Sequence, residues 1–178
     1  LHETEKPYEL LDEALRLGIK AFDTARVYGN GDCERILGEW LRGASSNELH
    51  YNEALGARRR REVTIVTKGG CGDGSTFWRP NLEYSSLRTE LDQSLKQLGL
   101  ESIPFYILHR DDTSKSIDEI CQTMQSFIDQ GLIGAWGVSN WQCHRLSEVL
   151  QYTKMNGLTP PCCSSLQDSL ASPLREPW

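Results

Sequence analysis

The stretch Val63-Thr64-Ile65-Val66-Thr67-Lys68 is a run of five β-branched residues that ends on a lysine. Such a run is typical of a strand buried on both faces, because branched side chains pack well on a pleated surface. Shorter apolar runs elsewhere in the chain predict four more strands, at residues 19–22, 103–108, 134–138 and 162–166. Each predicted strand ends beside a polar residue. In chain order these are Asp23, Lys68, His109, Ser139-Asn140 and Gln167.

Segments with apolar residues at helical spacing separate the predicted strands. The first opens at Pro7, carries leucines on one face and closes at Gly18. Asp32 is a predicted cap of the second, and Ser116 with Glu119 forms the capping-box pattern of the fourth. The predicted helices cover about residues 7–17, 32–42, 87–98, 116–130 and 142–155. Five helices thus alternate with five strands, beginning with a helix.

The segment 44–60 is polar and without periodicity, and we expect it to be a surface loop. It leads into the basic run Arg58-Arg59-Arg60-Arg61. A phosphate-binding or targeting patch is one interpretation of this run. A solvated turn before the next strand is the favoured one, because most charge runs lie on solvated faces.

Composition sets outer limits on the function. The chain has 178 residues, of which 38% are hydrophobic and 25% charged, as expected of one soluble globular domain. A net charge of −6 argues against general nucleic-acid binding, which needs a basic face. No apolar run reaches the roughly 20 residues that cross a bilayer, and no secretory signal is visible. We therefore expect a cytoplasmic protein with neither a nucleic-acid nor a membrane partner, and the missing initial Met suggests processing or a longer parent sequence.

Six cysteines offer no metal site by their spacing. None forms a Cys-x-x-Cys pair, and His2, His50 and His144 have no partner at ligand spacing, so we predict no metal. Cys162 and Cys163 are adjacent on a predicted strand, so their side chains should point to opposite faces. We expect all six to be free thiols in a reducing compartment.

Strands that alternate with helices and are buried on both faces predict a parallel sheet with helical crossovers. Both a doubly wound open sheet and a (β/α)8 barrel meet that description. In a barrel the carboxyl ends of all strands converge on one rim, whereas in a doubly wound sheet only those at the switch point meet. Polar residues at the end of every predicted strand therefore favour the barrel, and Tyr28, five residues beyond Asp23, can reach the same rim.

These residue types suit the reduction of a carbonyl group. Hydride transfer to carbon leaves negative charge on oxygen, which needs a proton or hydrogen-bond donor. Free tyrosine, with a pKa of about 10, donates poorly at pH 7 unless a nearby ammonium favours the phenolate. Lys68 can supply that ammonium to Tyr28, Asp23 can pair with the buried lysine, and His109 can orient the carbonyl.

The same residues resemble a known family. Phe22-Asp23-Thr24-Ala25, Val27-Tyr28-Gly29, Val66-Thr67-Lys68, Leu108-His109-Arg110 and Gly137-Val138-Ser139-Asn140 are similar in order and separation to motifs of the aldo-keto reductases. The resemblance spans roughly residues 8–170. It implies a (β/α)8 barrel and an NADPH-preferring oxidoreductase that acts on a small-molecule carbonyl substrate. It also implies the site residues: catalytic Asp23, Tyr28, Lys68 and His109, and Ser139, Asn140 and Gln167 as contacts of the nicotinamide carboxamide.

The length departs from the family pattern. A barrel of this type needs about 250 residues, and this chain has 178. By the resemblance, residues 1–178 form a single partial barrel domain that lacks the first strand and the last two strand–helix units. The later loops hold the cofactor's phosphates in the family, so we expect these 178 residues to bind NADPH weakly or not at all. The alternative to an active reductase is an inactive fragment, or a regulatory or binding protein that keeps the fold.

Overall fold

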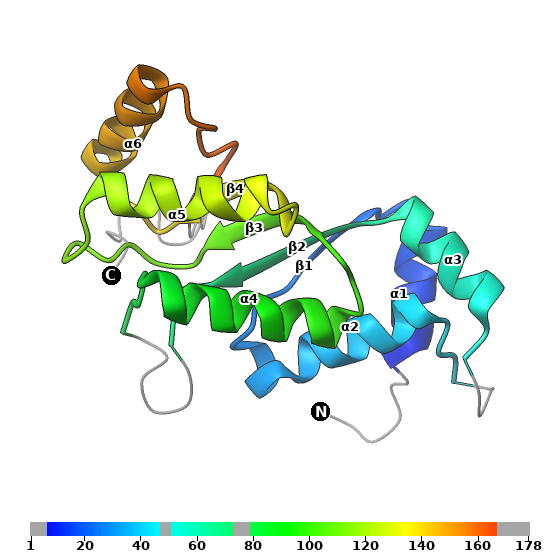
Figure 1. The fold of residues 1–178 in the computed structure, drawn as a ribbon. Coiled ribbons are helices and arrows are strands. Elements are labelled where there is room, and N and C mark those ends of the chain that lie inside the picture. The colour runs from blue at the N-terminus through cyan, green and yellow to red at the C-terminus, as the bar shows by residue number, and fades with distance from the viewer. Residues whose placement is uncertain (1–6, 47–50, 73–78, 167–178) are drawn as a thin grey trace, which may run out of the picture.

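The computed structural model describes residues 7–46, 51–72 and 79–166, and these form one curved parallel sheet with helices on its outer face (Figure 1). The sheet contains β1 (Ala21–Asp23), β2 (Thr64–Gly69), β3 (Ile103–Leu108), β4 (Ile133–Ser139) and β5 (Ser164–Ser165). The α-helices are α1 (Pro7–Arg16), α2 (Asp32–Arg42), α3 (Glu53–Glu62), α4 (Tyr84–Leu98), α5 (Ile117–Asp129) and α6 (Cys143–Asn156). A short 3-10 helix, η1 (Tyr28–Gly31), follows β1.

The strand order decides between the two architectures. The strands pair in parallel in the order β1-β2-β3-β4-β5, so spatial order equals chain order. A doubly wound sheet reverses its order at a switch point, and no reversal occurs among the described strands. The sheet is therefore an arc of a (β/α)8 barrel, as the strand-end residues predict. The arc is incomplete, because β1 and β5 each pair on one side only.

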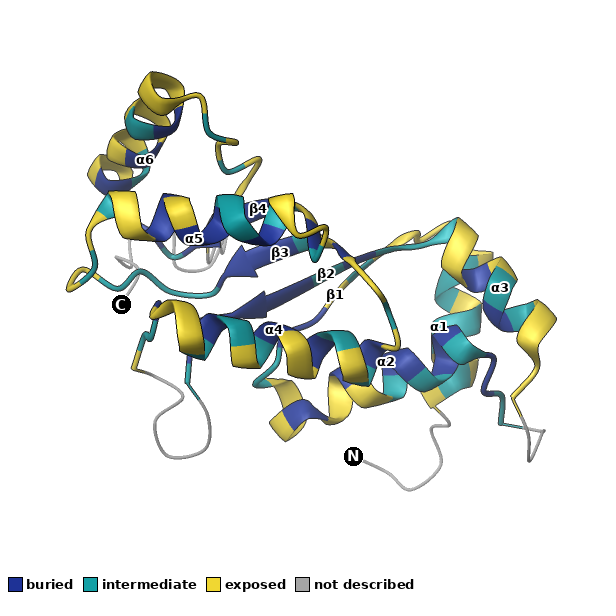
Figure 2. Cartoon of the chain, viewed as in Figure 1, coloured by how far each residue is buried: buried dark blue, intermediate teal, exposed yellow. Residues whose placement is uncertain are grey.

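The core lies between the sheet and the helices. Figure 2 shows that the helix faces turned toward the sheet are buried and the opposite faces exposed. Leu87, Leu91 and Leu98 place the buried face of α4 on this layer, and Phe127 does the same for α5. Each fully buried side chain of this kind stabilises the fold by about 1.5–3 kcal/mol.

The expectation of a loop over residues 44–60 is wrong in part, because α3 occupies Glu53–Glu62, although residues 44–46 and 51–52 belong to no helix or strand. Asn52 caps this helix by accepting the N–H of Leu55 at 3.1 Å. Gly56 lets the helix lie against α2, since a Cβ there would stand 2.6 Å from the Arg42 carbonyl carbon. The helix has almost no apolar stripe, so periodicity could not reveal it.

The expectation of a solvated arginine run is also wrong in part. Only 1% of the Arg59 side chain is exposed. Its Nη2 donates to both oxygens of Asp12, at 2.6 and 2.8 Å, and its Nη1 to the carbonyls of Trp40 and Ala44, both at 2.8 Å. The guanidinium also lies over the Trp40 ring, 4.7 Å from its centroid. Arg59 is thus a structural residue that joins α1, α2 and α3.

Several element boundaries, and the number of helices, differ from the sequence predictions. The last strand contains only Ser164–Ser165, not residues 162–166, because the prolines at 160 and 161 precede it. Gly31 is the N-cap of α2, and Asp32 is its first helical residue. The helices number six rather than five within the described ranges, since α3 was not predicted. None of the described helices has both the length and the apolar character needed to span a membrane.

Candidate active site

Lys68 is the centre of a polar cluster at the carboxyl ends of the strands. Its side chain is 4% exposed, although it carries an ammonium. Nζ donates to Asp23 Oδ2 at 2.5 Å, to the Thr24 carbonyl at 3.0 Å and to the Tyr28 hydroxyl at 3.3 Å. Three acceptors match the three donors of an ammonium, which explains how the charge is tolerated. Strands β1 and β2 thus hold a cation beside a phenol.

The loop after β1 brings Tyr28 to Lys68. Beyond the end of β1, the N–H of Arg26 still donates to the Lys68 carbonyl at 3.1 Å. The chain then turns through η1, where Gly29 and Asn30 have φ of 58° and 54°. Glycine and asparagine are the residues that adopt this left-handed conformation most readily. The turn leaves 38% of Tyr28 exposed, with its hydroxyl facing the ammonium.

His109 stands on the other side of Tyr28. The two rings meet edge to face, with centroids 5.7 Å apart and planes at 80°. Burial, and then the nearby cations Lys68 and Arg110, lower the pKa of His109 to about 4, although Asp23 acts in the opposite direction. The imidazole is therefore neutral at pH 7. A neutral imidazole can donate a hydrogen bond and orient a carbonyl, but it is not a proton reservoir.

Hydrogen bonds from backbone and side-chain groups link the carboxyl ends of neighbouring strands at one rim of the sheet. The N–H of His109 donates to the Gly69 carbonyl at 2.8 Å, and Asn140 Nδ2 donates to the His109 carbonyl at 3.3 Å. The N–H of Asn140 donates in turn to the Ser165 carbonyl at 3.1 Å. Asn140 has φ of 60°, a left-handed conformation that turns its side chain back over β3. Its Nδ2 also donates to Ser139 Oγ at 3.1 Å, which leaves the Ser139 proton available to a ligand.

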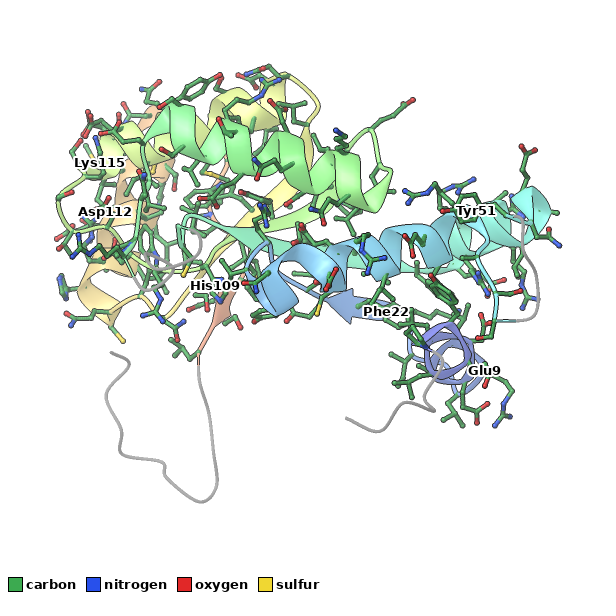
Figure 3. The ribbon with its side chains drawn as sticks, turned by 90° about the horizontal axis from the view of Figure 1, so that it is seen from below. Glu9, Phe22, Tyr51, His109, Asp112 and Lys115 are labelled. Atoms are coloured by element: carbon green, nitrogen blue, oxygen red, sulfur yellow. The ribbon has the colours of Figure 1, made fainter. Side chains whose placement is uncertain are left out.

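A cavity of about 260 Å³ opens between these groups. In Figure 3, His109 lies between the strand that carries Phe22 and the loop that carries Asp112 and Lys115. The structure brings together all four predicted catalytic residues and two of the three predicted cofactor contacts, and Gln167 lies outside the described residues. The cavity is lined by Asp23, Tyr28, Lys68, His109, Arg110, Ser139, Asn140, Ser165 and Leu166.

Sequence reasoning missed three contributors to this cavity. Arg110 and Ser165 line it, and the Thr24 carbonyl holds the lysine. Arg110 directly follows the predicted strand-end residue His109, and Ser165 lies near the end of the predicted strand 162–166, so position along the strand was an available signal for these two side chains. A backbone carbonyl leaves no signal in residue type, because every residue has one.

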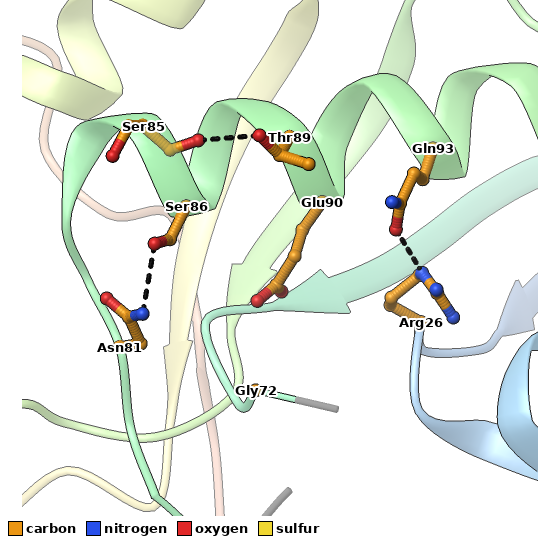
Figure 4. Close-up of a pocket in the computed structure, with 8 residues that line it drawn as sticks. All are labelled: Arg26, Gly72, Asn81, Ser85, Ser86, Thr89, Glu90 and Gln93. Carbon is orange, nitrogen blue, oxygen red and sulfur yellow. Dashed lines mark hydrogen bonds between the residues drawn. The ribbon is translucent and has the colours of Figure 1, made fainter. Parts of the chain in front are cut away.

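A second cavity, of about 370 Å³, lies apart from this cluster along the first half of α4 (Figure 4). Hydroxyl and amide side chains line most of it, and Arg26 reaches across to donate to Gln93 at 2.8 Å. It shares no lining residue with the cavity around Lys68. Neither Tyr28 nor His109 faces it, so the polarising groups lie in the smaller cavity.

Comparison with known proteins agrees with this geometry. A sequence profile of the Aldo/keto reductase family matches residues 2–176. A putative voltage-gated potassium channel subunit beta of Schizosaccharomyces pombe is 30% identical over 163 residues, which are 89% of this chain and 43% of that protein. An uncharacterized oxidoreductase of Bacillus subtilis, YqkF, is 28% identical over 84% of this chain and 44% of its own length. The chain thus spans less than half of either relative. It belongs to the aldo/keto reductase family.

Proposed function

We propose that the protein is an NADPH-dependent reductase of small aldehydes or ketones, with Tyr28 as the proton donor. The observation that carries this proposal is the Lys68 ammonium, which contacts the Asp23 carboxylate and the Tyr28 hydroxyl at once. A structural lysine could fill its donors with the carboxylate and backbone carbonyls alone, as Arg59 does. Contact with a half-exposed phenol at an open cavity adds a group that can release a proton.

The surroundings of Tyr28 support this role. As the phenol gives its proton to a carbonyl oxygen, the negative charge left on it is stabilised by the ammonium 3.3 Å away. Asp23 holds the Lys68 ammonium in place through its contact with Nζ. Neutral His109 donates a hydrogen bond to the same carbonyl oxygen, and its buried Nδ1 has no hydrogen-bond partner among the described residues. The two residues therefore divide the work, with Tyr28 as the acid and His109 as the positioning group.

Ser139 and Asn140 suit one end of the cofactor. When bound, NADPH supplies the hydride that makes the substrate carbon a carbinol carbon. Its carboxamide has a donor and an acceptor, and Ser139 can donate its hydroxyl proton while the fixed Asn140 amide offers its carbonyl oxygen. Gln167 is proposed as a third contact on the strength of its place after β5 in the chain.

Replacing Tyr28 by phenylalanine tests the proposal. The Tyr28→Phe variant of the full-length protein should lose about 10²–10⁴-fold in kcat/KM for NADPH-dependent aldehyde reduction, the usual share of general acid catalysis. Cofactor affinity should change little, because the hydroxyl contacts Lys68 rather than the carboxamide-binding side chains. Tyr51→Phe is the matched control, since Tyr51 is exposed and stacks on Arg42. Near-native turnover in Tyr28→Phe would rule out the acid role.

The 178-residue chain by itself should bind NADPH weakly. Its described contacts serve only the carboxamide, whereas the charged phosphates contribute much of the affinity for a dinucleotide. Fluorescence titration should therefore show no saturation at micromolar NADPH. Tight, saturable binding would mean that these residues hold the phosphates as well.

A regulatory role is the second candidate function, and the name of the Schizosaccharomyces pombe relative favours it. A subunit of that kind would keep the fold without needing turnover. Co-purification with a channel protein, together with turnover unaffected by Tyr28→Phe, would select this candidate. Loss of turnover in the variant selects the reductase.

A further inference from the structure

Cys162 and Cys163 form an exposed pair of thiols immediately before β5. The N–H of Cys162 donates to the Trp136 carbonyl at 2.8 Å, and the Cys163 carbonyl accepts the N–H of Val138 at 3.0 Å. These bonds hold the pair against β4. The expectation that the two side chains point to opposite faces is wrong, because the regular strand begins only at Ser164. The Cys162 thiol instead lies within hydrogen-bonding reach of Cys163.

The pair adjoins the candidate active site. Cys163 Sγ packs on Gly137, where a Cβ would stand only 2.5 Å from the sulfur. Gly137 is in register with Ile107, and Ile107 with Lys68, so Cys163 extends the row of residues that contains the lysine. Two residues further along the chain, Ser165 lines the cavity and accepts the Asn140 N–H. Oxidation of the thiols would therefore occur two residues from Ser165, which forms part of the cavity wall.

We propose that Cys162 and Cys163 are an oxidisable vicinal dithiol that reacts with hydroperoxides and, once oxidised, detaches the β5 wall of the cavity. The Cys162 sulfur attacks the hydroperoxide, so that an S–O bond forms, the O–O bond breaks and an alcohol (water, from hydrogen peroxide) leaves. The Cys163 sulfur then attacks the sulfenic acid, the S–S bond forms, and the hydroxide that leaves takes the Cys163 proton as water. Two thiols lose two electrons and two protons to one hydroperoxide.

The environment fixes the order of these steps. Partial burial, and after it the contact with Cys162, raise the pKa of the Cys163 thiol. A thiol is a poor nucleophile while it stays protonated. Cys162 therefore reacts first, and Cys163 resolves the sulfenic acid.

Formation of the disulfide should disrupt the pairing of β5 with β4, and the disulfide itself should be easily reduced. Neighbouring Cα atoms lie about 3.8 Å apart, below the roughly 4.4–6.8 Å that disulfides normally span, so the ring is strained and readily reduced. Closing the eight-membered ring twists the peptide between Cys162 and Cys163 away from its extended conformation. That geometry is incompatible with the extended hydrogen bonds to Trp136 and Val138. The loss of those bonds frees β5, which among the described strands pairs only with β4.

Peroxide treatment of the reduced full-length protein tests the proposal. One equivalent of hydrogen peroxide should remove two hydrogen atoms from the intact mass, and peptide mapping should place the new bond between Cys162 and Cys163. Hydrogen exchange at the Val138 and Asn140 amides should then become at least about tenfold faster, because these amides lose their acceptors on the 163–165 segment. Dithiothreitol should reverse both changes.

Matched variants make the result decisive. Replacing the other two exposed cysteines, in Cys33→Ser/Cys143→Ser, should leave the mass change intact, whereas Cys162→Ser should abolish it. Phenylarsine oxide, which needs two adjacent thiols, should bind the native pair with one-to-one stoichiometry and block the oxidation.

A sulfinic acid on Cys162 without a disulfide, a bond to any other cysteine, or no arsenical adduct at this pair would overturn the proposal. A Cys162–Cys163 disulfide with unchanged amide exchange would show that oxidation of the pair does not detach the β5 wall, and would overturn that part of the proposal. No readout involves NADPH, so the outcome is independent of the reductase proposal.

Discussion

Lys68 and Arg59 are both buried cations paired with a half-exposed aspartate, yet their surroundings differ. The Lys68 and Arg59 side chains are 4% and 1% exposed, and their partners Asp23 and Asp12 are 57% and 45% exposed. Arg59 directs its terminal nitrogens to one carboxylate and two backbone carbonyls within the helical layer. Lys68 directs one of its donors to a phenol at an open cavity.

The difference shows that burial of a paired charge does not identify a catalytic group. Arg59 contacts only groups that neither give nor take a proton during a reaction at pH 7, and its guanidinium stays charged. Lys68 contacts the Tyr28 hydroxyl, and in the proposed reaction it stabilises the anion that forms when the hydroxyl proton leaves. The function proposed for Lys68 therefore rests on the third group that it contacts, Tyr28, and not on its counter-ion.

The largest expected effect is on catalytic activity, and it should distinguish Lys68 from Arg59. Lys68→Met should lower kcat/KM for NADPH-dependent aldehyde reduction by about 10²–10⁴-fold, because the phenolate loses its ammonium. Arg59→Met should leave the turnover of the folded protein nearly unchanged, since Arg59 is remote from the cavity. Steady-state rates corrected for the folded fraction provide the measurement. An equal loss of turnover in both variants would show that the two cations do not differ in their contribution to activity.

A smaller effect should distinguish Arg59 from Lys68 by the stability that is lost when the counter-ion of each is removed. Asp12→Asn leaves Arg59 buried without its counter-ion and should lower the free energy of unfolding by roughly 2 kcal/mol, below the 3–5 kcal/mol typical of fully buried pairs because Asp12 is half exposed. Asp23→Asn should cost less, since a lysine can escape by releasing its proton whereas an arginine cannot. Urea titration measures both. The exposed pair Arg88–Asp92 supplies the control, and Asp92→Asn should cost less than about 1 kcal/mol.

The smallest effect concerns the imidazole near Lys68. The pKa of His109 is about 4 in the folded protein and near 6.5 in the unfolded chain. The unfolded state thus binds more protons between these values, so stability is full above pH 6.5 and declines as the pH falls toward 4. At pH 5 the loss should be on the order of 1 kcal/mol, after allowance for solvent screening of a partly exposed ring. Urea titrations at pH 7.5 and 5 should show it, and His109→Gln should remove it while His144→Gln leaves it unchanged.

The sequence predicted the parts of the fold that follow from local pattern. The β-branched run before Lys68, the leucines of α4 and the capping box at Ser116 have one structural meaning each, and all three elements are present. The helix α3 was not predictable in this way. Its stability comes from contacts with α1 and α2, chiefly Gly56 against the α2 backbone and Arg59 with Asp12. Such long-range contacts leave no periodicity in the helix itself.

The site was predictable as a set of residues but not as an arrangement. The convergence of strand ends on one rim places Asp23, Lys68 and His109 together in any barrel. Nothing in the sequence specified that the Thr24 carbonyl is the third acceptor of Lys68, or that Asn140 bridges to the His109 carbonyl. Backbone acceptors become visible only when the turns that present them are known.

The sequence by itself determined the order of the strands and of every described α-helix except α3, the polar residue at each predicted strand end and membership of the aldo/keto reductase family. These depend on residue type and on spacing along the chain. Only the tertiary structure decided which buried cation faces a cavity, that burial and neighbouring cations keep His109 neutral, and that the Cys163 sulfur lies against Gly137. Each of these is set by the distance between groups far apart in the chain, and electrostatic and packing energies depend on that distance rather than on sequence separation.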